Sequence, residues 1–582
     1  MNQTRTFLMF ALLAVSYFLF VGWQNDYAPR PAKQTSAVAS ASSSSAAADA
    51  SVPGAIPAEA SSTATTTNVA TPKVVAEAAS AAPTALIHVR TDLLDLTVDT
   101  RGGSLVHADL LKYGQEPRTH KHPKPAPVVL LTTDPATYSV VQSGLVSSDP
   151  SVAAADQPNH QAIFTSAKTD YVLAPDQNQL DVVLTWQNAA GLKVSKTYTF
   201  HRGSYVITVD QHIDNGADKA WQGNAYRQVL AVNPPKPGNW LKSYTDPEVR
   251  SFRGAAWYTG EKFDKLTFAD FSKPKDQLNS QIQGGWAAML RLYYVTAWIP
   301  PATETDHYST QTLDPSAANP RYLIRSVGPT LNVAPGQSVV SQARLYLGPN
   351  IQGTLDAIAP GLDLSIDYGM FKIIAVPMHW VLSQLHKVAG NWGIAIILLV
   401  LLIKGLTWKL TAVQYRSSAK MRKLAPRLKA LKERYGDDKK KMQQATMELY
   451  KKEKVNPMGG CLPMLIIMPV FYGLYFVLEY SLELRHAAFL WIPDLSHPDP
   501  LYILPIIYAL VMLGTQWLNP TAAGMDPTQA KMMKAMPLLF SVMFAFFPSG
   551  LCLYYAVNGL VGLGQQWWVT HHVDREAALT TD

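Results

Sequence analysis

The chain has 582 residues, of which 48% are hydrophobic and 16% are charged. Soluble domains carry about 25% charged residues, so this composition excludes an ordinary soluble protein and indicates that part of the chain lies in lipid. The formal net charge of +7 would suggest a nucleic-acid partner if it were spread over a soluble domain. The position of the positive charge along the chain therefore decides whether it indicates such a partner.

Six apolar stretches are long enough, or nearly long enough, to span a bilayer. The first follows Arg5 and ends in Gly22, Trp23 and Gln24 instead of the small residues of a cleavage site, so we expect an uncleaved anchor. The six stretches cover residues 7–23, 392–410, 461–478, 501–518, 535–547 and 551–569.

The excess of positive charge lies in one segment between the second and third stretches. From Gln414 to Met458 fourteen basic residues stand against five acidic ones. By the positive-inside rule this segment is cytoplasmic. Threading six spans from that point places both termini in the cytoplasm and residues 24–391 outside.

The outside region begins with a tether and continues as strands. Residues 28–84 are rich in Ala, Ser, Thr and Pro and cannot bury enough surface to offset the entropy of ordering. After them, polar and apolar residues alternate, for example over Leu94–Val98 and Tyr205–Val209. Similar runs recur up to Leu347 and predict an antiparallel β sandwich. The two cysteines, Cys461 and Cys552, both fall in predicted spans, so we expect no disulfide in this region.

Two helical segments flank the second stretch. The segment before it, up to Val388, is amphipathic and is expected to lie in the outer membrane interface, or else to pack on the sandwich as an ordinary helix. The basic segment after it predicts a helical hairpin that turns at Gly436, with Pro426 in the first turn of its first helix. Its basic exterior could bind ribosomal RNA or anionic lipid, or could simply be solvated.

Lys404 interrupts the second stretch after ten residues without a polar side chain. A lysine near the centre of a membrane helix costs roughly 2.5 to 3.5 kcal/mol, so it either snorkels to the interface or faces a polar cavity. On a helical wheel Thr407 and Thr411 share its face, with Gln414 beyond. The sixth stretch carries a second polar stripe, made by Tyr555, Asn558, Gln565 and Gln566.

The two stripes predict one shared groove, polar from mid-membrane to the cytoplasm and sealed by apolar side chains outside. The alternative is that these polar residues hold the helices together. In the fifth stretch unbranched and aromatic side chains predict a surface that repacks against varied apolar segments, although ordinary packing against lipid explains them too. The residues of this predicted slide are Met536, Phe540, Met543 and Phe544.

Catalytic motifs are absent from the sequence. We find no GxxxxGK[ST], HExxH or GxSxG motif and no cysteine or histidine cluster with metal-ligand spacing. The sequence therefore predicts a protein that is not an enzyme and that needs neither a cofactor nor a metal.

Ordered motifs along the chain resemble the YidC membrane protein insertases of Gram-negative bacteria. The motifs are TRGGSL at 100–105, FRGAAW at 252–257, GGWAAML at 284–290, TAWIP at 296–300, LDLSIDYG at 362–369, GNWG at 390–393, KVNPMGGCLP at 454–463 and FPSGLCLYY at 547–555. The resemblance implies a multi-pass protein of the bacterial inner membrane with six transmembrane helices, five of them forming the conserved insertase core, and a large periplasmic all-β supersandwich.

The resemblance also implies a function and partners. A cytoplasm-open hydrophilic groove would receive nascent inner-membrane proteins, and the protein would insert, fold and help to assemble them, alone or with the Sec translocon. The ribosome, through the basic hairpin, and membrane lipids are further implied partners, whereas DNA is not. The family's groove residue is usually arginine, which Lys404 replaces here, and Tyr555 matches the family's substrate-facing tyrosine. Val400 stands where a well-studied type of family member carries a residue with a hydroxyl group. The tail after His572 is short and slightly acidic.

We therefore expect eight segments. They are an anchor (1–27), a disordered tether (28–84), the periplasmic supersandwich (85–348), periplasmic or interfacial helices (349–390), the second transmembrane helix (391–412), the basic hairpin (413–458), the third to sixth transmembrane helices (459–570) and a short cytoplasmic tail (571–582).

Two other functions compete with insertion. A secondary transporter could use Lys404 as a substrate site, but it should show internal repeats and paired broken helices, and the sequence shows neither. The sandwich could bind carbohydrate through Trp240, Trp257 and Trp286, unless these side chains pack in its core.

Overall fold

The structure is a computed structural model. It describes residues 84–118, 123–235, 238–239, 246–273, 275–436, 438–453, 462–518, 535, 539 and 541–579. The predicted anchor and nearly all of the predicted tether lie outside the described residues, as do Trp240, Met536 and Phe540.

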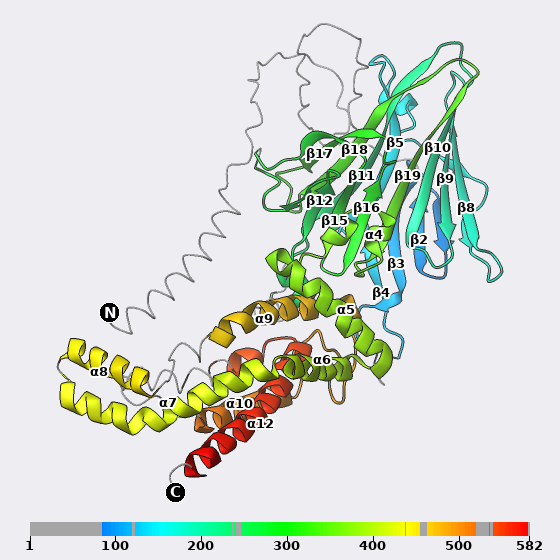
Figure 1. Ribbon diagram of the computed structural model, residues 1–582. Helices are drawn as coiled ribbons and strands as arrows, with labels where there is room; N and C mark the ends of the chain where they lie inside the picture. The colour runs from blue at the N-terminus through cyan, green and yellow to red at the C-terminus, as the bar shows by residue number, and fades with distance from the viewer. Residues whose placement is uncertain are drawn as a thin grey trace.

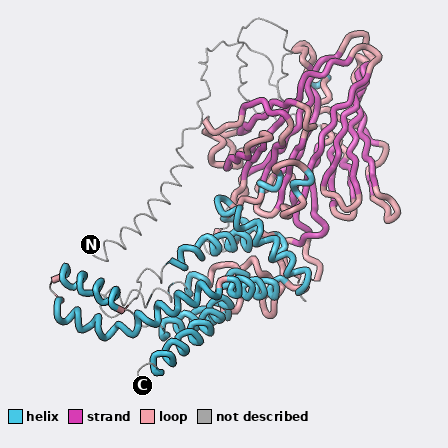
Figure 2. Tube along the Cα trace, in the orientation of Figure 1, coloured by secondary structure: helices cyan, strands magenta, loops and turns pink. Residues whose placement is uncertain are grey.

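Two large β-sheets form the first half of the described chain (Figures 1 and 2). One has the described strand order β14-β17-β18-β11-β5-β3-β2-β1-β7 with β4 paired to β3, and the other has the order β13-β12-β15-β16-β19-β10-β9-β8-β6. The bounds are β1 Leu86–Arg90, β2 Leu94–Asp99, β3 Ser104–Gly114, β4 Pro127–Leu131, β5 Ser139–Ser147, β6 Thr165–Ser166, β7 Asp170–Val172, β8 Gln179–Gln187, β9 Leu192–His201, β10 Val206–Asn215, β11 Trp221–Val232, β12 Gly254–Tyr258, β13 Phe263–Thr267, β14 Asn279–Gln283, β15 Trp286–Leu290, β16 Tyr294–Ile299, β17 Thr305–Leu313, β18 Arg321–Val333 and β19 Ser338–Pro349.

Alternating side chains explain why these strands form a sandwich. In β9 and β10 every second residue is buried, which gives each strand one apolar face. Val209 of β10 lies opposite Tyr198 of β9 and Ala343 of β19, and these three buried residues face the space between the sheets. The predicted sandwich is confirmed. Its described pairs are antiparallel except that β1 runs parallel to β7.

Two of the three tryptophans considered for carbohydrate binding, Trp257 and Trp286, pack in the interior. Trp286 is fully buried and its Nε1 donates a hydrogen bond to the carbonyl of Pro360 at 3.2 Å, and Trp257 is 8% exposed. Buried indole rings offer no face to a sugar, so the expectation of core packing is confirmed for these two residues.

The helices form a second part beneath the sandwich (Figure 1). A short helix, α3 (Pro247–Arg250), and the turns α4 (Leu355–Ile358), η2 (Leu362–Ser365) and η3 (Gly369–Phe371) lie between strands or lead into it. The longer helices are α5 Lys372–Ala389, α6 Trp392–Leu406, α7 Trp408–Tyr435, α8 Lys439–Lys452, α9 Leu462–Tyr480, α10 Ile503–Leu518 and α12 Ser549–Leu579.

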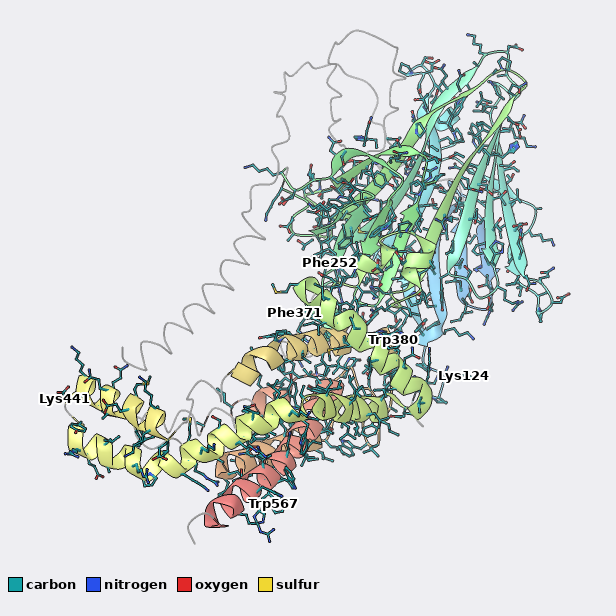
Figure 3. All side chains as sticks on the ribbon, in the orientation of Figure 1. Lys124, Phe252, Phe371, Trp380, Lys441 and Trp567 are labelled. Carbon is teal, nitrogen blue, oxygen red and sulfur yellow. The ribbon has the colours of Figure 1, made fainter. Side chains whose placement is uncertain are left out.

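The amphipathic helix predicted before the second stretch is α5. It packs against α9 and α6 and buries Ala375, Met378 and Leu382. Its other face leaves Ile373 and Trp380 exposed. Figure 3 labels Trp380 on this helix. An exposed apolar face agrees with an interfacial position, which stays a prediction.

The predicted basic hairpin is formed by α7 and α8. Asp438 caps α8 by accepting hydrogen bonds from the backbone N–H groups of Lys440 and Lys441. The seam between the two helices buries Leu424, Leu428 and Tyr450. In Figure 3 Lys441 marks the end of this hairpin, away from the sandwich.

The position predicted for Pro426 is wrong. Pro426 lies in the interior of α7, which runs without interruption from Trp408 to Tyr435. Packing overrides the helix-breaking tendency of proline here, because Leu424 and Leu428 are buried in the hairpin seam on either side of it. The break between the second stretch and the hairpin comes earlier, at Thr407, which separates α6 from α7.

A helix must be both long and apolar to cross a membrane. Among the described residues no single helix meets both conditions. The pair Trp392–Leu406 and Trp408–Leu424 passes the test together and is bent by 68°, and Ile503–Leu518 is a shorter apolar helix.

One side chain of the helical part joins it to the sandwich. Arg485, between α9 and α10, donates to the carbonyls of Gly114 at 2.8 Å and Gln115 at 3.3 Å, and to the hydroxyl of Tyr294. A single hydrophobic cluster also continues from Trp286 and Tyr346 of the sandwich to Leu382 and Leu399 of the helices. The two parts are therefore joined by both polar and apolar contacts.

The TRGGSL motif forms a turn held by side chains of β9. A Cβ on Gly102 would lie 2.2 Å from the Cα of His160, so only glycine fits there. Lys196 is fully buried and its Nζ donates to the carbonyls of Gly102 at 2.6 Å and Ser143 at 2.8 Å, while the Tyr198 hydroxyl donates to the Gly103 carbonyl.

We expect Lys196 to make the stability of the sandwich depend on pH. Burial lowers the pKa of Lys196 from 10.5 to about 7. The unfolded chain then binds more protons than the folded chain between these two values, so the free energy of unfolding rises with pH, by about 2 kcal/mol between pH 7 and pH 9. Thermal unfolding of the full chain and of Lys196→Met, followed by circular dichroism, measures this difference. A wild-type curve as flat as that of the variant would contradict it.

Candidate functional site

The candidate site lies where α12 packs against α6, α7 and α10. Glycines on α12 allow a close approach. A Cβ on Gly559 would lie 2.7 Å from Val511 of α10, and a Cβ on Gly562 would lie 3.2 Å from the Nζ of Lys404 and 3.4 Å from the hydroxyl of Tyr415. The ammonium group and the phenol therefore converge on the same point of α12.

Lys404 lies near the end of α6 and is half-buried. No hydrogen bond or ion pair is formed by its Nζ within the part of the chain that the structure describes. The positive charge of Lys404 is therefore not neutralised by an ion pair with any described residue. The side chain approaches α12 rather than extending along its own helix away from its neighbours, which favours the groove over snorkelling.

The two threonines behave differently. The hydroxyl of Thr407 donates to the carbonyl of Ile403, one turn earlier on α6. Thr411 is buried, and its hydroxyl accepts a hydrogen bond of 2.8 Å from the Nε2 of Gln565 on α12. The Thr407 hydroxyl thus bonds within its own helix end. Thr411 joins two helices, as expected if these polar residues hold the helices together. The bend at Thr407 also means that one helical wheel cannot place Thr411 and Gln414 relative to Lys404.

Gln565 and Tyr555 both keep a buried polar atom unpaired. The Oε1 of Gln565 and the hydroxyl of Tyr555 have no hydrogen-bond partner in the described structure. Asn558, one turn from Tyr555 on α12, is half-buried, and its amide makes no hydrogen bond with a described residue. Unpaired polar atoms between apolar helices are costly unless water or a ligand satisfies them.

Tyr555 belongs to an aromatic cluster. Its ring centroid lies 4.8 Å from that of Phe544, 5.1 Å from that of Phe471 and 6.1 Å from that of Tyr508. Phe544 is only 6% exposed, so it packs within the bundle and does not offer an outer surface here. A residue of the predicted groove and one of the predicted slide therefore touch each other.

Other residues of the predicted slide lie differently. Met543 is half-buried, and Met536 and Phe540 are outside the described residues. The exposed apolar side chains near them are Leu539 and Val542, which the sequence interpretation missed because it favoured methionine and phenylalanine. It also missed Tyr415, which follows Lys404 by three helical turns but lies beyond the bend.

Nothing in the described residues forms a metal site. No group of three or more histidine, cysteine, aspartate or glutamate side chains there could hold a metal ion. Cys552 is buried and its thiol donates to the carbonyl of Phe544. The described side chains of the site offer hydrogen bonding and a positive charge.

We expect Thr411 and Gln565 to be energetically coupled. In a double-mutant cycle with Thr411→Val and Gln565→Leu, their hydrogen bond should give a coupling energy of about 1 kcal/mol. The matched cycle of Thr407→Val with Gln565→Leu should give almost none, because among the described residues the Thr407 hydroxyl bonds only to its own helix. Thermal unfolding of the full chain in detergent measures both cycles, and equal coupling energies in the two would contradict the assignment.

Comparisons with known proteins place the chain in a family. The family model for the YidC periplasmic domain matches residues 86–381, and that for the 60Kd inner membrane protein matches residues 384–576. The chain is 41% identical over 579 residues to the membrane protein insertase YidC of Thioalkalivibrio sulfidiphilus strain HL-EbGR7, with 99% of each chain covered. It is 43% identical to that of Stenotrophomonas maltophilia strain R551-3, with 98% of this chain and 96% of the relative covered.

Solved structures give weaker likenesses. The crystal structure of an active YidC insertase with its first transmembrane domain resolved is similar to 83% of this chain and 94% of its own, with 19% identity and a TM-score of 0.34. A putative aldose 1-epimerase from Escherichia coli K12 is similar to 46% of this chain and to all of its own, with 11% identity and a TM-score of 0.28. The two family models and the relatives, matched over nearly the whole chain, show that this chain belongs to the YidC family of membrane protein insertases.

Proposed function

We propose that the protein inserts membrane proteins by receiving the polar flank of a hydrophobic segment in a groove between α6, α7 and α12. The observation that carries this proposal is the ammonium group of Lys404, which approaches Gly562 without an acidic partner among the described residues. Membership in an insertase family supports the same function.

The geometry of α6 gives the groove a physical role. From its start at Trp392 to Lys404 the helix rises about 18 Å, whereas a hydrocarbon core is about 30 Å thick. A polar flank that reaches Lys404 would then have only the apolar part of α6 left to pass. Water and the unpaired groups of Asn558 and Gln565 would partly replace its bulk hydration.

Exposed apolar faces provide a path for the hydrophobic segment itself. Leu401, Leu402 and Leu406 of α6 and Leu510 and Leu513 of α10 are exposed. The segment would move along such faces into lipid while its flank occupies the groove. Met536, Phe540, Met543 and Phe544 remain the proposed slide, with Phe544 contributing once the aromatic cluster opens.

The proposed topology follows from charge. Both termini and the basic hairpin lie in the cytoplasm, six helices span the membrane, and the sandwich lies in the periplasm. The position of α8 far from the sandwich supports this arrangement (Figure 1). The ribosome and the Sec translocon are proposed partners that rest on the family resemblance, and no described feature favours a transporter or a carbohydrate binder.

A reconstituted system tests the role of Lys404. We expect the purified protein in liposomes to insert a single-span substrate with an aspartate in its translocated tail. Lys404→Arg should keep this activity, because it keeps the charge, and Lys404→Ala should lower the rate roughly tenfold, the effect of about 1.4 kcal/mol of lost interaction. The readout is protease protection of the tail.

Two controls make this result specific. Lys409→Ala removes an exposed charge five residues away and should leave insertion unchanged. A substrate with asparagine in place of aspartate should depend less on Lys404. If Lys404→Ala inserts both substrates as well as the wild type does, the ammonium group does not attract the tail.

A further inference from the structure

A cavity of about 650 Å³ lies at the lower end of the sandwich, on the side that meets the helical part. Its walls come from β4, β5, β11, α3 and the turn between β15 and β16, and from Arg485 and His497 in the segment between α9 and α10. Pockets of this size hold ligands as large as a typical drug molecule. Neither the groove nor the proposed insertion mechanism uses it.

Three guanidinium groups gather around Glu248 in the wall of this cavity, two on its carboxylate and one on its backbone carbonyl. Glu248 faces Arg485 at 3.5 Å and Arg291 at 3.6 Å, and its backbone carbonyl accepts a hydrogen bond of 2.9 Å from the Nε of Arg253. The acidic groups in the lining are Asp134, Asp246 and Glu248, and the basic ones are Arg253, Arg291, Arg485 and His497. Asp246 already caps α3 by accepting from the N–H of Glu248.

Arg253 is the least satisfied of the three arginines. Arg485 and Arg291 also donate to backbone carbonyls of β3 and β4, whereas the two Nη groups of Arg253 have no acceptor among the described residues. Burial, and next the charge of Arg291, lower the pKa of Arg253, and Glu248 and Asp246 offset this only in part. A bound anion would stabilise this charge.

The rest of the lining is largely apolar. Val128, Leu130, Phe268 and Met289 are buried side chains of the cavity wall. A free arginine fork matches the paired oxygens of a phosphate or a carboxylate, and the apolar wall suits a hydrocarbon body attached to it. A small inorganic anion would leave most of the cavity empty.

We propose that this cavity binds an amphiphilic anion of lipid type, with its phosphate or carboxylate head on Arg253 and Arg291 and its apolar body against β4 and β15. The head would sit between the sandwich and Arg485, which also joins the sandwich to the helices. Binding would thus strengthen that junction. This proposal does not depend on the groove.

A binding measurement on the full chain in phosphatidylcholine nanodiscs tests it. The probe is dihexanoyl phosphatidic acid, and native mass spectrometry and calorimetry report its stoichiometry and affinity. We expect one site, weakened about tenfold or more by Arg253→Gln, as loss of charged hydrogen bonds to a phosphate requires. Arg344→Gln is the matched control, because Arg344 also donates to a single backbone carbonyl, that of Ile358, but does not line the cavity.

A second variant tests the site independently if Arg253→Gln fails to fold. Thr137 lies at the exposed rim of the cavity, so Thr137→Trp should fill the space and reduce binding while leaving every arginine in place. Equal affinities of Arg253→Gln and Arg344→Gln would overturn the proposal. So would inorganic phosphate or dihexanoyl phosphatidylcholine binding as tightly as the phosphatidic acid, because the site requires both an anionic head and an apolar body.

Discussion

The helical part holds a positive charge, that of Lys404, between apolar helices without a counter-ion among the described residues. Lys404 meets no carboxylate among the described residues, and Gly562 leaves room for its ammonium group on α12. Such a charge is stable in a membrane protein only if water or a ligand reaches it. The bend at Thr407, the bridge from Thr411 to Gln565 and the unpaired atoms of α12 are all consistent with a hydrated space beside this residue.

The sandwich is attached to this region rather than loosely tethered to it. Arg485 bonds to β3, Arg250 pairs with Glu479 of α9 at 3.0 Å, and the hydroxyl of Tyr293 donates to the Glu479 carbonyl. Buried polar contacts of this kind fix orientation more than they add stability. The sandwich therefore holds a defined position relative to the helices, and the cavity beside Arg485 lies at that junction.

Much of the fold could be predicted from the sequence because local patterns and global packing agree. Alternating residues in β9 and β10 and helical spacing in α8 are periodic signals that the structure follows. Pro426 was misplaced because burial on both sides of it outweighs its local tendency to end a helix. The bend at Thr407 had no signal in the sequence, since threonine is compatible with a continuous helix.

The candidate site was predictable in its residue types but less so in their contacts. A charge in an apolar stretch singled out Lys404, and a stripe of polar residues singled out Gln565. The contact between Phe544 and Tyr555 joins residues of two different helical segments, which no single-helix periodicity reveals. The surroundings of Arg253 are set by Glu248 of α3, by Arg291 between β15 and β16 and by Arg485 between α9 and α10, and therefore needed the tertiary structure.

We propose that the space beside Lys404 contains water and opens only to the cytoplasm. The most direct measurement is the reactivity of a single cysteine at Asn558→Cys, in a chain with Cys461 and Cys552 replaced by serine, toward a charged, membrane-impermeant thiol reagent. Leu402→Cys, on an exposed apolar face, serves as the lipid-facing control. We expect labelling of Asn558→Cys from the cytoplasmic side alone, with little labelling of Leu402→Cys from either side. Labelling of Asn558→Cys from both sides, or from neither, would contradict it.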